Sequence, residues 1–365
     1  MKVSFLDLGA ATRALHADID DAVTRVVRSG WYIGGPELAG FEAEFAAYCQ
    51  ADHCVGVGNG LDALTLALRA MDVGPGDEVI VAANGYIATL LAVSMTGATP
   101  VLVEPDPATH NLDPHRVEAT ITPRTRVILP THLYGQPADL DPLLAIARAH
   151  GLRLLEDGAQ AHGSRYKGQR VGAHGDAVTW SFYPSKNLGA LGDGGAVSTN
   201  DAALARRIRT LGNYRSATRY VNDERGVNSR LDPLHAAVLR AKLPHLDEWN
   251  DRRRAIAERY LAAFAGIGIG LPQVPEWADP AWHLFVVTLA DRDAFQAQLR
   301  AAGVETLIHY PIPPHRQQAY FDLGLPAGSF PIAEQLANQV LSLPIGPQMS
   351  DAEVEVVIAA VREAG

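Results

Sequence analysis

Short apolar segments alternate with helical segments through the first two hundred residues, and this alternation most constrains the fold. We expect strands at residues 53–58, 78–82, 99–103, 125–130, 152–155 and 177–183. The helices expected between them cover residues 61–71, 86–97 and 140–150. Strands linked in this way are typical of a mostly parallel sheet with helices on both faces. The sequence therefore predicts an α/β fold.

Polar side chains follow several of these expected strands. They are Glu104, Asp106, His132, Asp157 and Gln160. In open α/β sheets, ligands bind beyond the carboxyl ends of the strands. We therefore expect the functional site at this edge of the sheet.

The length of the chain predicts two domains. Its 365 residues exceed what a single hydrophobic core usually supports. We place the boundary near residues 244–249, where Pro244 interrupts a helical pattern. The expected division is a large α/β domain over residues 1–245 and a smaller α+β domain over residues 246–365.

Composition and charge argue against several classes of protein. The formal net charge is −10, and no dense basic cluster suggests a nucleic-acid partner. No apolar run is long and unbroken enough to span a membrane, and the acidic N-terminus does not resemble a signal peptide. Cys49 and Cys54 fit a reducing compartment, so the cytoplasm is the expected location, although pairing of the two stays open.

Several catalytic motifs are absent from the sequence. There is no HExxH or paired-cysteine zinc motif, so no metal site is predicted. There is also no G-x-S-x-G motif of serine hydrolases and no P-loop. The glycines at positions 56, 58 and 60 do not match the dinucleotide-binding fingerprint, which argues against an oxidoreductase.

A lysine in a glycine-rich loop provides the remaining candidate for chemistry. Lys186 lies between two expected strands. A lysine amine condenses with aldehydes, and pyridoxal 5′-phosphate (PLP) uses this reaction together with defined partners. Asp157 suits the acid that keeps the pyridine nitrogen protonated. Tyr86 suits the flat group that packs on the ring.

A phosphate group needs backbone N–H groups at a helix start and nearby hydroxyls. Gly60 and Leu61 begin an expected helix, and Ser181 precedes Lys186 by five residues. Each residue also has a simpler explanation, because the lysine could lie on the surface, the aspartate could cap a helix and the tyrosine could belong to the core. Their combination in one chain order on an alternating β/α pattern favours the PLP interpretation.

The chain resembles the DegT/DnrJ/EryC1/StrS family of PLP-dependent nucleotide-sugar aminotransferases. The matching stretches cover nearly the whole chain and include SGWYIGGPELAGFEAEFAAYC, VGVGNGLDALTLAL, GPGDEVIVAANGYIATLLAV, HLYGQPADLDP, EDGAQAHG, SFYPSKNLGALGDGGAVST, GVNSRLDPLHAAVL, WHLFVV and HYPIPPH. The resemblance implies PLP-dependent transferase fold type I, which is like that of aspartate aminotransferase.

The resemblance also implies roles for the residues around the cofactor ring. Lys186 would form the internal aldimine and move the proton during aldimine/ketimine exchange. Asp157 would pair with the pyridine nitrogen, and Gln160 would lie near the phenolic oxygen. Tyr86 would stack on the ring. Family members that deoxygenate sugars carry a histidine in place of the lysine, so Lys186 argues against that activity.

The family works as a homodimer with shared active sites. The resemblance implies that Ser181, Gly60 and Leu61 bind the phosphate, with Asn228 reaching in from the second subunit. The segment 213–230 would serve the neighbouring site. The substrate-binding candidates are Tyr183, Arg230, His309, Tyr310 and His315. Among them, the Arg230 guanidinium suits the carboxylate of the amino donor.

The implied activity is ping-pong transfer of an amino group from L-glutamate to a nucleotide-linked keto sugar. The segment NYRSATRYVNDERGVNSRLD most resembles the branch that aminates C3 of dTDP-3-keto-6-deoxyhexoses. Two alternatives stay open, namely a C4 aminotransferase that acts on a 4-keto nucleotide sugar and a non-catalytic, PLP-binding regulatory protein.

Overall fold

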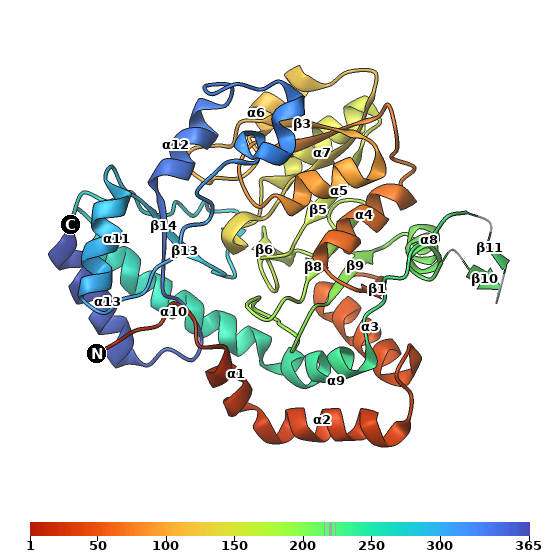
Figure 1. The fold of residues 1–365 in the computed structure, drawn as a ribbon, viewed down its shortest axis with the longest axis horizontal. Coiled ribbons are helices and arrows are strands. Elements are labelled where there is room, and N and C mark those ends of the chain that lie inside the picture. The colour runs from red at the N-terminus through yellow and green to blue at the C-terminus, as the bar shows by residue number, and fades with distance from the viewer. Residues whose placement is uncertain (215, 219–220, 223) are drawn as a thin grey trace.

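A seven-stranded sheet forms the centre of the molecule (Figure 1). The computed structural model describes residues 1–214, 216–218, 221–222 and 224–365. Across the sheet, the strands are β1 (His53–Val57), β9 (Gly195–Thr199), β8 (Ala177–Ser181), β5 (Arg153–Asp157), β4 (Thr125–Leu129), β2 (Glu78–Ala82) and β3 (Thr99–Val103). The pairs that contain β9 are antiparallel, and the other four pairs are parallel. The expected mostly parallel sheet is confirmed.

The side chains of β2 alternate between two cores, because successive residues of a strand point to opposite faces. Val79 and Val81 pack on one face, and Ile80 packs on the other. The first face is covered by α4 (Gly60–Ala70), α5 (Ala88–Thr96) and α8 (Ala202–Gly212). The second face is covered by α3 (Gly35–Cys49), α7 (Leu140–His150) and α9 (Pro233–Lys242). The sheet therefore has helices on both faces, as the apolar strands predict.

Two of these helices have ends that the local sequence explains. Asn59 caps α4, because its side-chain oxygen accepts a hydrogen bond of 2.9 Å from the Asp62 N–H. Gly97 ends α5 in the left-handed conformation, with a φ of 87°. Both helices begin at the edge of the sheet where the parallel strands end.

A further core lies beside the sheet, on the left of Figure 1. Its elements are α10 (Leu246–Phe264), α11 (Arg292–Ala301), α13 (Asp351–Ala364) and the antiparallel pair β13 (Phe285–Thr288) and β14 (Val340–Leu343). Val3, near the N-terminus, also packs in this core and pairs with Val304. The domain boundary between residues 245 and 246 stays a prediction.

The remaining elements are short or peripheral. The helix α2 (His16–Ser29) packs on α9 through Ile19, Ala22 and Val26. The others are α1 (Leu8–Ala14), α6 (Pro114–Val117), α12 (Pro331–Gln339), the three-stranded sheet of β12 (Ala278–Asp279), β6 (Arg165–Tyr166) and β7 (Gln169–Arg170), and the pair β10 (Ser216–Thr218) and β11 (Val221–Asn222). Among the described residues, no helix combines the length and apolar character needed to cross a membrane.

Candidate active site

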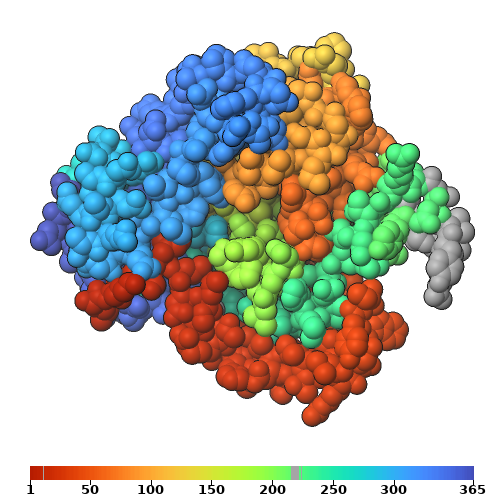
Figure 2. Space-filling model, in the orientation of Figure 1, coloured from red at the N-terminus to blue at the C-terminus, as the bar shows by residue number. Residues whose placement is uncertain are grey.

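The carboxyl ends of β5 and β8 lie side by side in the middle of the sheet. Asp157 is the last residue of β5, Ser181 is the last residue of β8, and the two strands are parallel neighbours. The loop that follows β8 carries Lys186. In Figure 2, the yellow-green part of the chain lies near the centre of the visible face, between the red N-terminal and the blue C-terminal segments.

Lys186 has the electrostatic surroundings of a nucleophilic amine. Its side chain is half-buried. Burial lowers the pKa of Lys186 to about 8, because it disfavours the charged ammonium, while the negative charge of Asp157 acts in the opposite direction. A lysine with such a pKa has a substantial uncharged fraction near neutral pH and can attack a carbonyl carbon.

Three histidines near Lys186 are held in the neutral form. Burial lowers the pKa of His162 to about 3 and that of His309 to about 4, and the charge of Lys186 adds to both effects. The pKa of His283 is lowered in the same way. The imidazoles therefore add no positive charge around the amine at neutral pH. His162 also packs against the ring of Trp180, with centroids 5.2 Å apart.

The loop that carries Lys186 is tightly held. The Lys186 N–H donates to the Tyr183 carbonyl at 2.9 Å. The buried ammonium of Lys242 donates to the Gly189 carbonyl at 2.7 Å. A Cβ atom on Gly189 would lie only 2.5 Å from the Pro184 carbonyl oxygen, so the turn requires glycine there. Lys242 lies far along the sequence, on α9, and the sequence alone did not single it out.

Asp157 is buried, and both of its carboxylate oxygens accept a hydrogen bond. Thr89 Oγ1 donates to Oδ2 at 3.0 Å, and the Ala159 N–H donates to Oδ1 at 3.1 Å. Thr89 was not among the residues predicted for the site. A sequence signal exists for it, because Thr89 follows Tyr86 by three residues, across the turn that leads into α5.

Gln160 is buried and connects two segments of the site. Its Oε1 accepts a hydrogen bond of 2.6 Å from the Tyr134 N–H, and its Nε2 donates to the Tyr310 hydroxyl at 3.2 Å. These contacts assign the orientation of the amide group. Tyr134 has a φ of 62°, in the left-handed region, and its hydroxyl donates to the His309 carbonyl. Sequence reasoning missed Tyr134, because a backbone donor leaves no signature in side-chain type.

The start of α4 faces the end of β8. A Cβ atom on Gly60 would lie 2.8 Å from the Cβ of Ser181, so only glycine allows this close approach. The Asn59 side chain already occupies the Asp62 N–H. Within the described parts of the chain, the backbone N–H groups of Gly60 and Leu61 have no hydrogen-bond partner. Two free donors and the Ser181 hydroxyl are what an anion needs at a helix start.

These residues fit PLP. An amine with a lowered pKa, a buried carboxylate with fixed oxygens, a buried amide with an assigned orientation and a helix start beside a serine come together at one edge of the sheet. They match the amine, the pyridine partner, the phenolic-oxygen partner and the phosphate cradle that the cofactor requires. Thr89 and Tyr134 hold the carboxylate and the amide in place through hydrogen bonds. Lys242 holds the loop of the amine in the same way.

Two of the aromatic candidates have exposed side chains. Tyr86 is 58% exposed, and its ring lies 5.3 Å from that of Tyr310. Tyr183 is exposed as well. The His309 ring makes a hydrogen bond of 2.8 Å with Ser342.

The other predicted binding residues make no described contact with Lys186 or Asp157. Arg230 donates to the Asn213 side chain at 2.8 Å, and Asn228 is exposed. His315 is fully buried and makes a hydrogen bond of 3.0 Å with Glu334. The segment 213–230 includes residues 215, 219, 220 and 223, which lie outside the described residues. The roles predicted for these side chains stay predictions.

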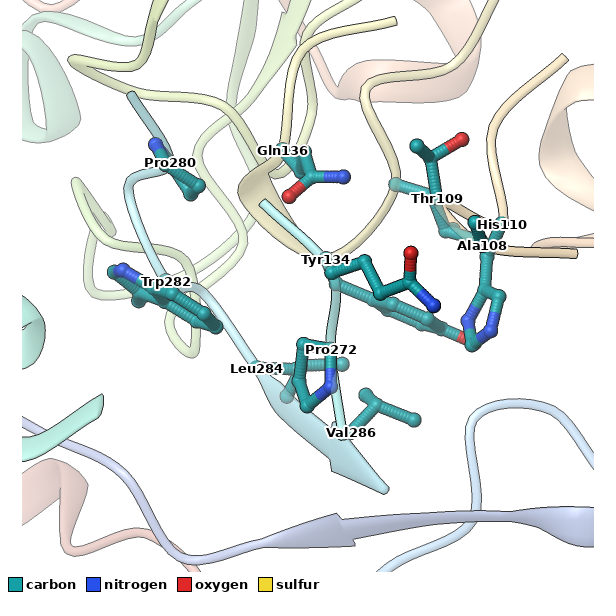
Figure 3. A pocket seen from close by; sticks show the side chains of 12 residues that line it. Ala108, Thr109, His110, Tyr134, Gln136, Pro272, Pro280, Trp282, Leu284 and Val286 are labelled. Carbon is teal, nitrogen blue, oxygen red and sulfur yellow. The ribbon is translucent and has the colours of Figure 1, made fainter. Parts of the chain in front are cut away.

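A separate small pocket lies on the other side of Tyr134 (Figure 3). Its walls include the rings of Tyr134 and His110, with Trp282 across the opening. Neither Lys186 nor Asp157 lines it. The pocket therefore differs from the arrangement around the lysine, although the segments of Tyr134 and of residues 282–284 border both.

Comparison with known proteins agrees with this geometry. The model of the DegT/DnrJ/EryC1/StrS aminotransferase family matches residues 13–362. The erythromycin biosynthesis sensory transduction protein EryC1 of Saccharopolyspora erythraea is 60% identical over 363 residues, which cover 99% of each chain. The dTDP-3-amino-3,4,6-trideoxy-alpha-D-glucose transaminase of Streptomyces venezuelae is 56% identical over 363 residues, which cover 99% of this chain and 96% of that protein.

Solved structures extend the likeness to the fold. The crystal structure of S. venezuelae DesV in complex with a ketimine intermediate has a TM-score of 0.98 and 56% identity, covering 99% of this chain and 98% of that one. Similar solved structures include forms with bound PMP. The expected fold type and the expected cofactor are confirmed. Because the family model and the relatives cover nearly the whole sequence, the chain belongs to the DegT/DnrJ/EryC1/StrS family of PLP-dependent aminotransferases.

Proposed function

We propose that the protein transfers an amino group from L-glutamate to a dTDP-linked 3-keto-6-deoxyhexose. The observation that carries this substrate is the 56% identity, over 99% of the chain, to a transaminase named for a dTDP-3-amino sugar. The Lys186 amine beside the buried Asp157 supports the reaction type. The proposal places the enzyme in the biosynthesis of deoxyamino sugars.

The residues at the ring would control protons. When bound, PLP supplies a ring that withdraws electrons from the carbon at which a bond breaks. Asp157 would hold a proton on the ring nitrogen, since its two fixed oxygens favour an ionised carboxylate. Lys186 Nζ would accept a proton from one carbon and deliver it to another. Its pKa of about 8 allows both protonation states near neutral pH.

The surrounding residues would orient the cofactor and the substrates. Gly60 and Leu61 would donate their N–H groups to the phosphate, together with the Ser181 hydroxyl. Gln160 Nε2 would face the phenolic oxygen, because Tyr134 occupies the amide oxygen. Tyr86 would pack on the ring.

The substrates would enter from the exposed side of the site. Arg230 would bind the carboxylate of glutamate through paired N–H groups. The sugar nucleotide would lie against Tyr183, His309 and Tyr310. His315 was predicted for the same role, but it is fully buried and offers no surface for contact. The closed, neutral surroundings of His309 suit an uncharged sugar ring, because its pKa of about 4 keeps the imidazole uncharged.

We also propose that the protein works as a homodimer in which each segment 213–230 completes the other subunit's site. The exposed Asn228 would then reach the phosphate of the neighbouring site. Exposed apolar side chains offer material for an interface, and they include Trp31, Tyr32 and Ile33. The buried free thiols of Cys49 and Cys54 support a reducing location such as the cytoplasm.

The substrate proposal is tested by incubating the purified protein with PLP, L-glutamate and either a 3-keto or a 4-keto dTDP-6-deoxyhexose. We expect nitrogen on C3 of the product, seen by NMR, and 2-oxoglutarate in equal amount. Product only from the 4-keto sugar would favour the C4 aminotransferase and contradict the proposal.

One relative supports a second candidate function, because EryC1 is named a sensory transduction protein. A non-catalytic PLP-binding regulator would bind PLP and the sugar nucleotide without converting it. In that case neither keto sugar would yield an amino sugar, although the cofactor would still attach to the protein. No residue of the expected set Lys186, Asp157, Gln160 and Ser181 is missing from the chain, which favours turnover over binding alone.

A further inference from the structure

We propose that Thr89 is a positioning residue that keeps the cofactor's ring nitrogen protonated by acting through Asp157. The inference rests on the proposed function, since it requires Asp157 to face that nitrogen. It adds a residue that neither the motif around Lys186 nor the comparisons single out. The hydroxyl of Thr89 touches neither the ring nor the substrate in this account, and its whole effect passes through one carboxylate oxygen.

The distance and the chemistry of the pair show which group donates the hydrogen bond. Thr89 Oγ1 and Asp157 Oδ2 lie 3.0 Å apart, and both side chains are 6% exposed. An ionised carboxylate has no proton to give, so the hydroxyl donates. The Ala159 N–H holds the other oxygen at 3.1 Å. Each carboxylate oxygen therefore accepts one hydrogen bond. Each still has a lone pair that can accept a second one.

The backbone around Asp157 is fixed as well. Its N–H donates to the Pro130 carbonyl at 2.9 Å, and its own carbonyl accepts from the His132 N–H at 3.0 Å. With main chain and both oxygens held, removal of the Thr89 hydroxyl changes one contact and leaves the rest of the carboxylate's anchoring in place. The charged or titratable groups that interact with the carboxylate are Lys186 and Tyr310.

The turn at the start of α5 places Tyr86 and Thr89 close together. Tyr86, proposed to pack on the ring, precedes the helix, and the Thr89 N–H donates to the Tyr86 carbonyl at 3.4 Å. Residues three apart in a helical turn lie on the same side. One short segment would therefore support both the face of the ring and the partner of its nitrogen.

The chemical effect is a choice of position for one proton. A hydrogen bond donated to a carboxylate favours its charged form. With the Thr89 hydroxyl present, the proton shared between the ring nitrogen and Asp157 would stay on nitrogen. Without it, the carboxylate would attract that proton more strongly, so the proton would lie closer to the carboxylate oxygen and the ring would carry less positive charge. Such a ring would withdraw electrons less, so the proton transfers would slow.

The experiment uses the full-length enzyme reconstituted with PLP labelled with ¹⁵N at the ring nitrogen. Thr89→Val replaces the hydroxyl with a methyl group of similar size, and Thr89→Ser keeps the hydroxyl. We expect a protonated-pyridine ¹⁵N signal in the wild type and in Thr89→Ser, and a signal moved toward neutral pyridine in Thr89→Val. We also expect kcat to fall about tenfold in Thr89→Val while KM for the sugar nucleotide stays within about twofold, since one charge-assisted hydrogen bond is lost.

Several outcomes would overturn the inference. If Thr89→Val keeps the protonated signal, or loses activity only in proportion to thermal stability, Thr89 is a structural residue. Thr89→Ala, which also lacks the hydroxyl, must give the same signal as Thr89→Val, and a protonated signal there contradicts the proposal even where the valine variant folds poorly. A wild type that shows a neutral ring, or whose signal Asp157→Asn does not alter, overturns the role of Asp157 in the proposed function and the role of Thr89 with it.

Discussion

Lys186 joins properties that rarely occur together in a lysine. It is half-buried and close enough to Asp157 to feel its charge, and its loop is closed by a backbone hydrogen bond to Tyr183. Burial disfavours the ammonium and the nearby carboxylate favours it, and burial is the larger effect. The amine is therefore ready to react while its position stays fixed.

This balance predicts the pH at which Lys186 reacts. In the protein without cofactor, acylation of Lys186 should rise with a midpoint near pH 8, because its pKa is lowered to about 8. In Asp157→Asn the midpoint should fall further, since the charge that favours the ammonium is gone. The measurement is mass spectrometry of the modified peptide across a pH series.

A surface lysine provides the comparison in the same samples. The hydrogen bond that the Lys167 ammonium donates to Asp141 raises the pKa of Lys167, so its acylation should require a higher pH than that of Lys186. If the two lysines titrated together, or if Asp157→Asn moved the Lys186 midpoint upward, the electrostatic account of the amine would be wrong.

The supporting lysine of the loop gives a second prediction at this scale. Lys242→Met should weaken PLP binding by about tenfold, because the Gly189 carbonyl loses its hydrogen bond and the Lys186 loop loosens. Titration of the protein with PLP, followed by fluorescence, measures the dissociation constant. Lys2→Met, at an exposed position, is the matched control and should bind as the wild type does. Equal affinity in both variants would show that Lys242 does not hold the loop.

At the scale of elements, the alternating pattern predicted the central sheet well. β2 and β3 occupy the same residues as the strands expected at 78–82 and 99–103. Local apolar pattern is sufficient there because each strand is buried on both faces. The strand expected at 177–183 is shorter in the structure, where β8 ends at Ser181. Its pairing with β9 ends there, opposite Gly195, and no local pattern contains that contact.

The site divides in the same way between local and distant information. Asp157, Gln160, Ser181 and Lys186 lie within one stretch of thirty residues and were named from the sequence. Thr89 and Tyr134 were not, because each contributes one hydrogen bond across the fold to that stretch. Side-chain type alone does not reveal such partners.

Glu104 illustrates how a residue at a strand end can serve the fold instead of a ligand. Its two carboxylate oxygens accept hydrogen bonds from the N–H groups of Ile332 at 2.8 Å and Ala333 at 3.0 Å. These are first-turn donors of α12, whose own N-cap residue, Phe330, offers no side-chain acceptor. Glu104 therefore caps a helix from more than two hundred residues away.

This cap predicts a loss of stability. Glu104→Ala should lower the free energy of unfolding by about 1–2 kcal/mol, because one buried and one partly buried N–H group lose their acceptor. Denaturant unfolding followed by circular dichroism measures the change. Glu363→Ala removes an exposed carboxylate near the end of α13 and should shift the free energy by less than about 0.5 kcal/mol. Similar values for the two variants would contradict the capping role.

At the scale of the whole molecule, the cores on the two faces of the sheet are separate from the core that lies beside it. We propose the division into residues 1–245 and 246–365 because α10, α11 and α13 share a core separate from the sheet. Val3 also joins that core, so the N-terminus would fasten the two parts together. Asn228 is exposed in the single chain, as expected if its target belongs to a second copy.

The dimer with shared sites predicts complementation between two inactive variants. Lys186→Ala and Asn228→Ala should each lose most activity alone. After unfolding and refolding together, mixed dimers should contain one intact site, and about a quarter of the wild-type activity should return. Refolded samples of each single variant are the controls. No recovery, with mixed dimers confirmed by mass spectrometry, would place Asn228 in its own subunit's site or outside it.

The central claim is that Lys186 holds PLP covalently, and chemical trapping tests it most directly. The protein is incubated with PLP, reduced with borohydride, digested and analysed by mass spectrometry. We expect a phosphopyridoxyl group on the peptide that contains Lys186 and none on that peptide in Lys186→Ala. A label on another lysine, such as the buried Lys242, or no label at all with intact folded protein, would contradict it.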